Sequence, residues 1–394
     1  MKNNAEIIQM ISENKKLKPS TTRLDTYSLN LYSKIEGLSL MELIQEADDD
    51  EENIRKVRRR RINNHLDHFI NCLENDTHKH KRGMGYTPRS IHDILSRVRA
   101  FYNYYEIQLP RTYLPQIPSN EKSTDIPTLK EIRYVIDNTG KSKHRAIILF
   151  MLSSGLSSNE VSSLTKKQFM EATSEYQNSQ RLPDALDELK TLIDNGEAII
   201  PTWELTRGKT NYNFITFNSP EATMEIVEFL TTKAHPTDKR LFEMGNVGIN
   251  DLYLKLGKRN NIGYTNNGHN KFHSHAMRKV FATTLAGVEI NGVPLDSLFI
   301  EFLLGHKLPG SMEPYYKNRP ERLKKIYIQI VDSLSVNDLN KLTIKSPEYL
   351  KLEKENNDMK TNIEAIVEEA MLKHDQELRK QQDRMSIDDL FHDF

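Results

Sequence analysis

Four groups of residues in the second half of the chain have types and spacings suited to phosphoryl transfer. An i, i+3 spacing places His275 and Arg278 on one face of a helix, so both can approach one anion. Cations and tyrosines without clustered carboxylates can act without metal: a phenolate attacks a phosphodiester, cations stabilise the non-bridging oxygens, and a lysine or histidine moves protons. The pattern predicts no cofactor and no metal. The four groups are Lys209, the pair His275 and Arg278, the segment Leu304-Gly305-His306, and the pair Tyr315-Tyr316.

The sequence resembles the tyrosine recombinase (phage integrase) family in these residues. His275 and Arg278 match the family's His-x-x-Arg motif, and the segment 304–306 matches its Leu-Gly-His motif. Tyr315 stands nine residues after the last of these, where the family has its nucleophile. Lys209 corresponds to its hairpin lysine. The resemblance covers the N-terminal module and about 125–335, and segment 153–164 with the paired tyrosines looks most like archaeal integrases.

The resemblance implies a site-specific DNA recombinase, or integrase, of a mobile genetic element. Such an enzyme cleaves and rejoins double-stranded DNA through a 3′-phosphotyrosyl intermediate, without ATP, and two duplexes with two cuts each imply a tetramer. Tyr315 would be the nucleophile. Arg278 and His306 would hold the non-bridging oxygens, His275 would assist proton transfer and phosphate binding, and Lys209 would protonate the leaving oxygen. The second tyrosine of the pair remains an alternative nucleophile.

One position departs from the family pattern. The family has an arginine two residues after the glycine of its Gly-Leu-Arg-x-x-Glu motif, and this chain has Ser157 there, followed by the matching Glu160. A neutral hydroxyl gives a hydrogen bond about half as strong as a charge-assisted one, so another cation is needed. We expect Arg207 to substitute, with Arg145 as a second candidate. A competing hypothesis is a DNA-binding protein of the same fold with lost or reduced catalysis, acting in regulation or replicon maintenance; a topoisomerase-like relaxing activity is a less favoured enzyme variant.

Three amphipathic helices are predicted in residues 1–108. Apolar residues recur at helical intervals in 21–46, in 62–73 and in 88–105. The resemblance implies that this module is a core-binding domain that closes on DNA. A basic run stands near the start of the second helix and could contact phosphates, or it could be a solvated face neutralised by the acidic run 48–52. The basic run is Arg58, Arg59, Arg60 and Arg61.

The expected fold class is mainly α, with a helical core-binding domain, an α-rich catalytic domain that contains a small β-hairpin, and a helical tail. Prolines predict a linker over 109–127. In the catalytic domain, 128–340, we expect a helix from 128 to 136, a buried helix from 143 that ends near Gly155, and strands around 198–200 and 212–217. Helical patterns continue to about residue 334.

The last segment, 341–394, is acidic and only loosely periodic. A solvated or partner-docking helix is favoured over a long coiled coil, because heptads are not sustained. The resemblance implies that this tail docks on a neighbouring protomer and serves in oligomerisation.

Composition limits the remaining possibilities. Lys plus Arg and Asp plus Glu number 55 each, so a polyanion must be met by local patches and not by a net positive field. Cys72 is the one cysteine, which excludes an intrachain disulfide and fits a reducing compartment. No apolar run has the length of a membrane span or a signal peptide. We therefore expect a soluble protein in the cytoplasm, associated with the nucleoid and not with a membrane.

Overall fold

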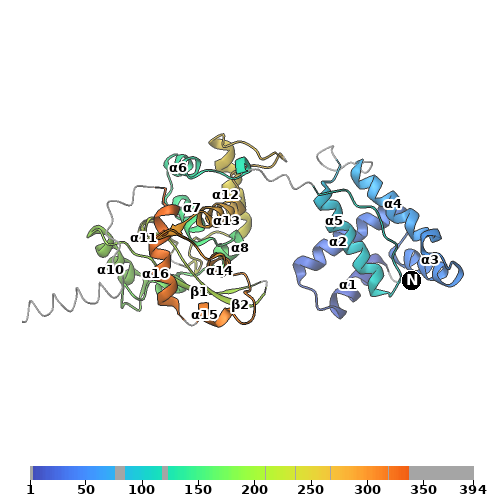
Figure 1. Ribbon diagram of the computed structural model, residues 1–394, viewed down its shortest axis with the longest axis horizontal. Helices are drawn as coiled ribbons and strands as arrows, with labels where there is room; N and C mark the ends of the chain where they lie inside the picture. Colours follow the sequence, from blue (N-terminus) through green and yellow to red (C-terminus); the bar gives the residue numbers. More distant parts are fainter. Residues whose placement is uncertain are drawn as a thin grey trace, which may run out of the picture. The chain divides into compact units, whose positions relative to one another are not determined.

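The computed structural model describes residues 3–75, 85–117, 123–208, 210–235, 237–266, 268–317 and 319–336 (Figure 1). The chain divides into two compact units, Met1–Asn120 and Glu121–Phe394, and each has its own apolar core. The division falls inside the segment predicted as a linker. The predicted tail, 341–394, lies outside the described residues.

The described part of the N-terminal unit contains five α-helices. Of the three predicted helices, α4 and α5 are confirmed, but the prediction of one helix over 21–46 is wrong. Gly37 ends α2 in the left-handed region at φ 71°, and Ser39 then starts α3 in a capping box with Glu42. Helix α1 was not predicted, although Asn3 and Glu6 form a capping box at its start. The helices are α1 (Asn4–Asn14), α2 (Pro19–Glu36), α3 (Leu40–Asn53), α4 (Arg61–Glu74) and α5 (Pro88–Tyr104), with a 3₁₀-helix at Val57–Arg59.

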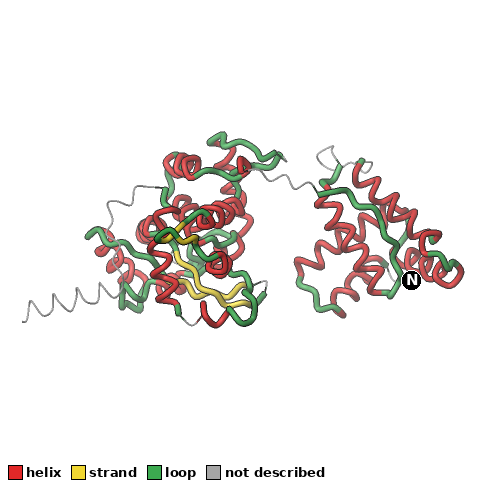
Figure 2. The backbone as a smooth tube through the Cα atoms, in the orientation of Figure 1, coloured by secondary structure: helices red, strands yellow, loops and turns green. Residues whose placement is uncertain are grey.

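The C-terminal unit is mainly helical with two small antiparallel sheets, which confirms the expected fold class (Figure 2). Its helices are α6 (Leu129–Asp137), α7 (Ser142–Ser154), α8 (Ser158–Ser163), α9 (Lys166–Ala172), α10 (Leu182–Asp194), α11 (Pro220–Thr232), α12 (Asn246–Arg259), α13 (Ser274–Ala286), α14 (Ser297–Leu303), α15 (Glu313–Lys317) and α16 (Pro320–Ile330). Its strands are β1 (Thr202–Arg207), β2 (Tyr212–Phe217), β3 (Glu289–Ile290) and β4 (Val293–Pro294), and 3₁₀-helices lie at Ser123–Asp125 and Val331–Leu334.

Helix α7 forms the centre of this unit and is buried from Ala146 to Ser154, with α11 and α13 packed against it. It ends at Gly155, as predicted, where φ is 67°. A Cβ atom at this position would lie 2.7 Å from the ring of Phe281 on α13. Both the backbone conformation and the close approach therefore require glycine, and they fix the end of α7 against α13.

Strands β1 and β2 form the predicted hairpin, with Arg207 opposite Tyr212 at its end. The prediction of a strand at 198–200 is wrong, because this buried segment precedes β1 and pairs with side chains instead of a neighbouring strand. The carbonyl of Ile199 accepts a hydrogen bond from Thr223, and the backbone N–H of Ile200 donates to the hydroxyl of Tyr176 at 3.3 Å. These side chains satisfy backbone groups that a sheet would otherwise pair.

Candidate active site

Arg278 lies on α13, is 6% exposed, and is held from three directions. Its Nη1 donates to the carbonyl of Gly155 at 2.8 Å, and its Nη2 donates to the carbonyl of Leu304 at 2.6 Å. The same Nη2 lies 2.9 Å from Nε2 of His306. Burial lowers the pKa of Arg278, but a guanidinium stays charged at neutral pH. A fixed, buried positive charge therefore lies where α7, α13 and the end of α14 meet.

His306 is oriented by its two ring nitrogens. Because arginine can only donate, Nε2 is the acceptor toward Arg278, and Nδ1 carries the proton that is donated to Glu301. The side chain of His306 is 42% exposed, so the imidazole borders solvent. Glu301 was not predicted as a site residue. It lies on α14 five positions before the histidine, and that position carries no motif signal.

Arg207, the last residue of β1, joins the same cluster. Its Nη1 donates to the carbonyl of Gly305 at 2.9 Å, directly after the carbonyl that holds Arg278. Its Nε lies 3.3 Å from Oε1 of Glu160. Among the described residues, nothing pairs with the remaining Nη2 of Arg207. One turn of backbone thus collects two arginines from distant parts of the sequence.

Gly305 makes this turn possible. Its φ is 68°, and a Cβ atom there would lie 3.0 Å from the ring of Phe214 on β2. A larger residue would have to push the strand away from the turn that holds Arg207 and Arg278. The glycine that the sequence places beside His306 is therefore required by a left-handed backbone and a close contact.

Ser157, at the position where an arginine was expected, is occupied by helix capping. Its backbone N–H and its hydroxyl each donate to Oε2 of Glu160 at 2.8 Å, at the start of α8. The other oxygen of Glu160 faces Arg207. The carboxylate therefore connects the serine to the arginine. The pattern Ser-x-x-Glu is typical of such a cap in a sequence. The contact between Glu160 and Arg207 of β1 is visible only in the folded structure.

Three other predicted site residues are His275, Lys209 and Arg145. His275 is exposed on the first turn of α13, one turn before Arg278. Lys209 lies outside the described residues. Arg145 forms an ion pair with Glu225 of α11 at 2.6 Å and donates to the carbonyl of Thr139, so its described partners belong to another part of the unit.

The two tyrosines of α15 differ sharply. Tyr315 is 72% exposed, whereas Tyr316 packs its ring 5.5 Å from that of Phe302 and donates its hydroxyl to Asp296. Burial, and then Asp296, raise the pKa of Tyr316 to about 12. Both tyrosines line a cavity of about 500 Å³ beside the β3–β4 hairpin. Figure 1 shows α15 next to β1 and β2, and Lys317 lies 4.4 Å over the ring of Tyr212.

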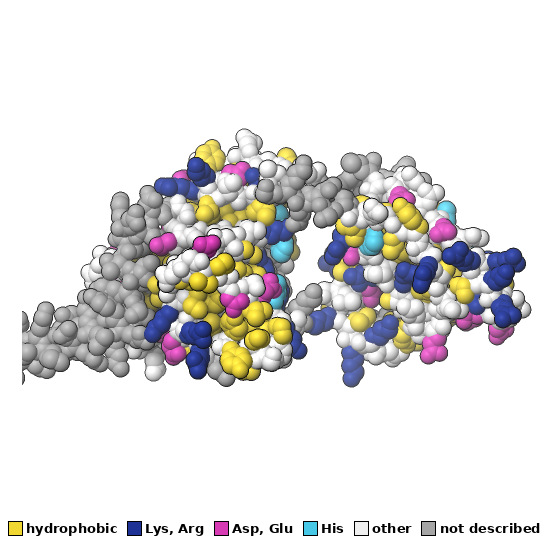
Figure 3. Space-filling model, in the orientation of Figure 1, with side chains coloured by type: hydrophobic (Ala, Val, Ile, Leu, Met, Phe, Trp, Pro, Cys, Tyr) yellow, Lys and Arg dark blue, Asp and Glu magenta, His cyan; other side chains and the backbone are white. Residues whose placement is uncertain are grey.

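The basic run of the N-terminal unit divides into two halves. Arg60 is buried and pairs with Glu51 at 2.6 Å, and Arg61 pairs with Asp50 at 2.8 Å. Arg58 and Arg59 are exposed on the 3₁₀-helix before α4, and no ion pair holds them among the described residues. Figure 3 shows Lys and Arg interspersed with Asp and Glu on the visible face of this unit. The acidic residues of this unit therefore neutralise Arg60 and Arg61, while Arg58 and Arg59 keep their charge available at the surface.

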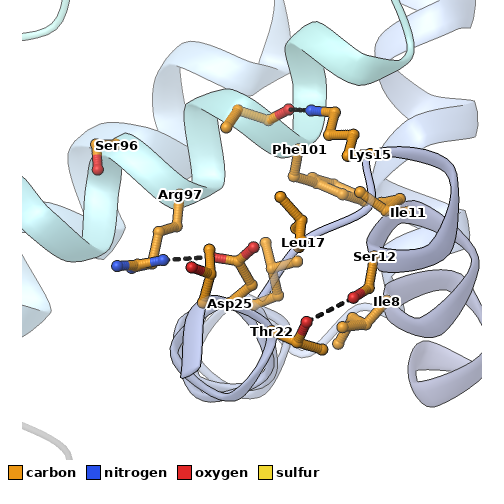
Figure 4. Close-up of a pocket in the computed structure, with 13 residues that line it drawn as sticks. Ile8, Ile11, Ser12, Lys15, Leu17, Thr22, Asp25, Ser96, Arg97 and Phe101 are labelled. Carbon is orange, nitrogen blue, oxygen red and sulfur yellow. Dashed lines mark hydrogen bonds and ion pairs between the residues drawn. The ribbon is translucent and has the colours of Figure 1, made fainter. Parts of the chain in front are cut away.

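Another cavity, of about 270 Å³, lies between α1, α2 and α5 (Figure 4). Its walls are mostly apolar, and an ion pair between Arg97 and Asp25 closes one side. It contains none of the predicted site residues. In the described ranges, no group of three or more His, Cys, Asp or Glu side chains could hold a metal ion, and no helix is long and apolar enough to cross a membrane.

No protein-family model matches this sequence, and no curated protein matches it either. Solved structures do. A lambda integrase dimer bound to a COC′ core site is 10% identical, with a TM-score of 0.49 over 81% of this chain and 96% of that one. The Tn1549 transposon integrase in complex with transposon right end DNA is 13% identical, with a TM-score of 0.46 over 83% and 100%. The XerA recombinase is 15% identical, with a TM-score of 0.33 over 82% and 95%. At these values the likeness is one of fold alone and assigns no role to any residue.

Proposed function

We propose that this protein is a site-specific DNA recombinase that cleaves and rejoins DNA through a 3′-phosphotyrosyl intermediate. One observation carries the proposal: Arg278 and Arg207 donate to the two successive carbonyls that follow α14, and His306, the next residue, accepts a hydrogen bond from Arg278. Arg278 is oriented by neutral carbonyls that leave its charge uncancelled, and Arg207 is oriented by one carbonyl and faces Glu160 with its Nε. Such a preorganised pair is suited to an oxyanion that gains charge in the transition state.

The proposed reaction balances without a co-reactant. The oxygen of Tyr315 attacks the phosphorus, the bond to the 5′-oxygen breaks, and a phosphotyrosyl ester replaces the phosphodiester. His275 assists removal of the phenol proton, and Lys209 gives a proton to the departing 5′-oxygen. Attack by a 5′-hydroxyl of a partner strand reverses these steps. The ester conserves the energy of the broken bond, so ATP is not consumed.

We assign to Arg207 the work of the missing arginine. The motif position 157 and Arg207 contact the same carboxylate, Glu160, from opposite oxygens. The guanidinium thus lies one carboxylate away from the place where the family carries its cation. Its Nη2, which the described residues leave without a partner, can donate to a non-bridging oxygen.

Exposed Arg58 and Arg59 are proposed to contact the DNA backbone, because arginines at a surface bind phosphates without reading sequence. Strand exchange between two duplexes requires four active tyrosines, hence a tetramer on DNA, and segment 341–394 is proposed to join its protomers. We also propose that the protein belongs to a mobile genetic element, as the resemblance of segment 153–164 to archaeal integrases implies, and that it acts at the nucleoid in the cytoplasm.

The second hypothesis is a DNA-binding protein of this fold with weak or no catalysis. Ser157 favours it, since both its hydrogen-bonding groups serve the cap of α8 and supply no charge. The two functions predict the same binding and differ in whether a covalent adduct forms.

The test uses the full chain. Random duplexes are enriched for a bound site, the site is then made with a nick near the scissile phosphate so that cleavage cannot reverse, and the mixture is kept free of metal. A covalent adduct that disappears in Tyr315→Phe supports the recombinase and its nucleophile. Tight binding of the enriched site with no adduct overturns the recombinase and supports the binding protein.

A further inference from the structure

The helix that carries Tyr315 cannot hold itself in place. Helix α15 has five residues, and a helix this short is not stable in water from its own backbone hydrogen bonds. Tyr315 is 72% exposed and adds little packing. The direction in which its hydroxyl points therefore depends on what its neighbours contact.

Tyr316 makes those contacts. Successive residues of a helix point about 100° apart, so Tyr316 faces inward where Tyr315 faces out. Its ring packs against Phe302, and its hydroxyl donates to the carboxylate of Asp296. Phe302 lies on the last turn of α14 and Asp296 is the N-cap of the same helix. One side chain thus binds α14 at both ends.

Asp296 uses its two oxygens for two tasks. Oδ1 accepts the backbone N–H of Leu298 at 2.9 Å, which caps α14, and Oδ2 accepts the hydroxyl of Tyr316. A phenol bound to a carboxylate keeps its proton at neutral pH, and the pKa of Tyr316, raised to about 12 mainly by burial, agrees with this. Such a phenol is a poor nucleophile.

The opposite end of α14 leads into the cation cluster. The carbonyls of Leu304 and Gly305, which follow its last residue, hold Arg278 and Arg207. The helix has seven residues and is roughly 10 Å long. It is therefore a short element that the tyrosine helix contacts at both ends, and its C-terminal end also leads into the charges that would bind phosphate.

We propose that Tyr316 is the anchor of the nucleophile helix and that Asp296 is the positioning residue that sets Tyr315 relative to the two arginines. This inference rests on the proposed function and adds a mechanism to it. A second tether, Lys317 over the ring of Tyr212, remains when the anchor is cut. Cutting the anchor is therefore expected to slow adduct formation without abolishing it.

Two variants remove the hydrogen bond of the anchor. Tyr316→Phe removes the hydroxyl, and Asp296→Ser removes the carboxylate that accepts it, while the short serine side chain still caps α14. At saturating nicked DNA, each is expected to slow adduct formation about tenfold, with affinity for DNA within about twofold of wild type. The double variant should be no slower than the slower single one, because both lose the same contact. Tyr134→Phe, the same change at an exposed tyrosine of α6, is the control and should have no effect.

A second measurement does not depend on catalysis. In the free protein, the amides of Glu313, Tyr315, Tyr316 and Lys317 should exchange with deuterium faster in both anchor variants, while those of α7 are unchanged. Unchanged exchange in α15 overturns the anchor, as does an adduct on Tyr316 in the Tyr315→Phe protein. If wild type forms no adduct, the proposed function fails and exchange alone decides the anchor, so the two failures are distinguishable.

Discussion

The two units differ in the partners that hold their arginines. In the N-terminal unit, neighbours in the sequence, Arg60 and Arg61, are paired with the carboxylates of Glu51 and Asp50. In the C-terminal unit, Arg278 and Arg207 are brought together on carbonyl oxygens, and Arg207 also faces the carboxylate of Glu160. A carboxylate cancels the charge it orients, whereas a carbonyl orients it and leaves the charge intact. Density of basic residues in a sequence is therefore a weaker guide to an anion site than the partners those residues find.

Replacement of Arg278 is expected to change the rate of DNA cleavage more than replacement of any other arginine. In Arg278→Lys the charge stays but the fork that bridges two carbonyls is lost, so adduct formation should fall at least 100-fold, roughly 3 kcal/mol of transition-state stabilisation. Single-turnover assays on nicked DNA measure this, with circular dichroism to verify the fold. The matched control is Arg61→Lys, which should cleave at the wild-type rate. Equal rates for both variants would remove the distinction between the two units.

Arg207 tests whether a carbonyl-held arginine can replace a missing one. Arg207→Ala should slow cleavage about 10- to 100-fold, and adding Ser157→Arg to that variant should restore part of the rate, because a cation returns beside Glu160. The same single-turnover assay applies, with Arg145→Ala as the control. If Ser157→Arg alone greatly raised cleavage while Arg207→Ala had no effect, the replacement would be wrong.

The sequence predicted the bounds of two helices of the C-terminal unit, α6 and α7, because they begin or end at local signals. Thr128 caps α6 and Gly155 ends α7, as the pattern indicated. Where apolar residues continued across a boundary, as between α2 and α3, periodicity alone missed the turn at Gly37. A buried segment such as 198–200 also reads as a strand, since its sequence does not show that Tyr176 and Thr223 satisfy its backbone.

For the candidate site, motifs named the residues but not their connections. Nothing in the sequence near His306 identifies Glu301 as its partner, and nothing near Tyr316 identifies Asp296, because these contacts join residues across turns of the chain. Arg207 was found by its position beside the hairpin turn. That it shares a carboxylate with position 157 required the fold.

In the N-terminal unit, we expect Arg58 and Arg59 to contribute to DNA affinity and Arg60 to contribute to stability. The double variant Arg58→Ala, Arg59→Ala should weaken DNA binding several-fold and reduce the slope of log affinity against log salt by about 2, since two phosphate contacts are lost. Arg60→Ala should leave that slope unchanged and instead destabilise the unit, because Glu51 loses a buried partner. Titrations at several salt concentrations measure the slope, and the reverse pattern would contradict the division of the run.

The smallest expected effect concerns a histidine held by carboxylates. His65 on α4 lies 2.7 Å from Glu36 with one ring nitrogen and 2.7 Å from Glu46 with the other. Its hydrogen bond to Glu36, and then that to Glu46, raise its pKa above the ordinary 6.5 against the effect of burial. The charged form is thus favoured in the folded state. The resulting stability is fully present below about pH 6.5 and is lost as pH rises through the folded-state pKa.

His65→Gln keeps the size of the side chain and cannot charge, so it should flatten this dependence and cost roughly 0.5–1 kcal/mol at pH 6, as for partly exposed ion pairs. The one tryptophan, Trp203, lies in the C-terminal unit, so its fluorescence follows that unit while circular dichroism follows both. The difference between the two urea transitions, measured from pH 5.5 to 8.5, isolates the N-terminal unit. The same substitution at the candidate site is the control. His306→Gln should slow cleavage and leave the difference between the two urea transitions unchanged. A stability of the N-terminal unit that rises with pH in wild type would show that His65 is not held as an imidazolium between the two carboxylates.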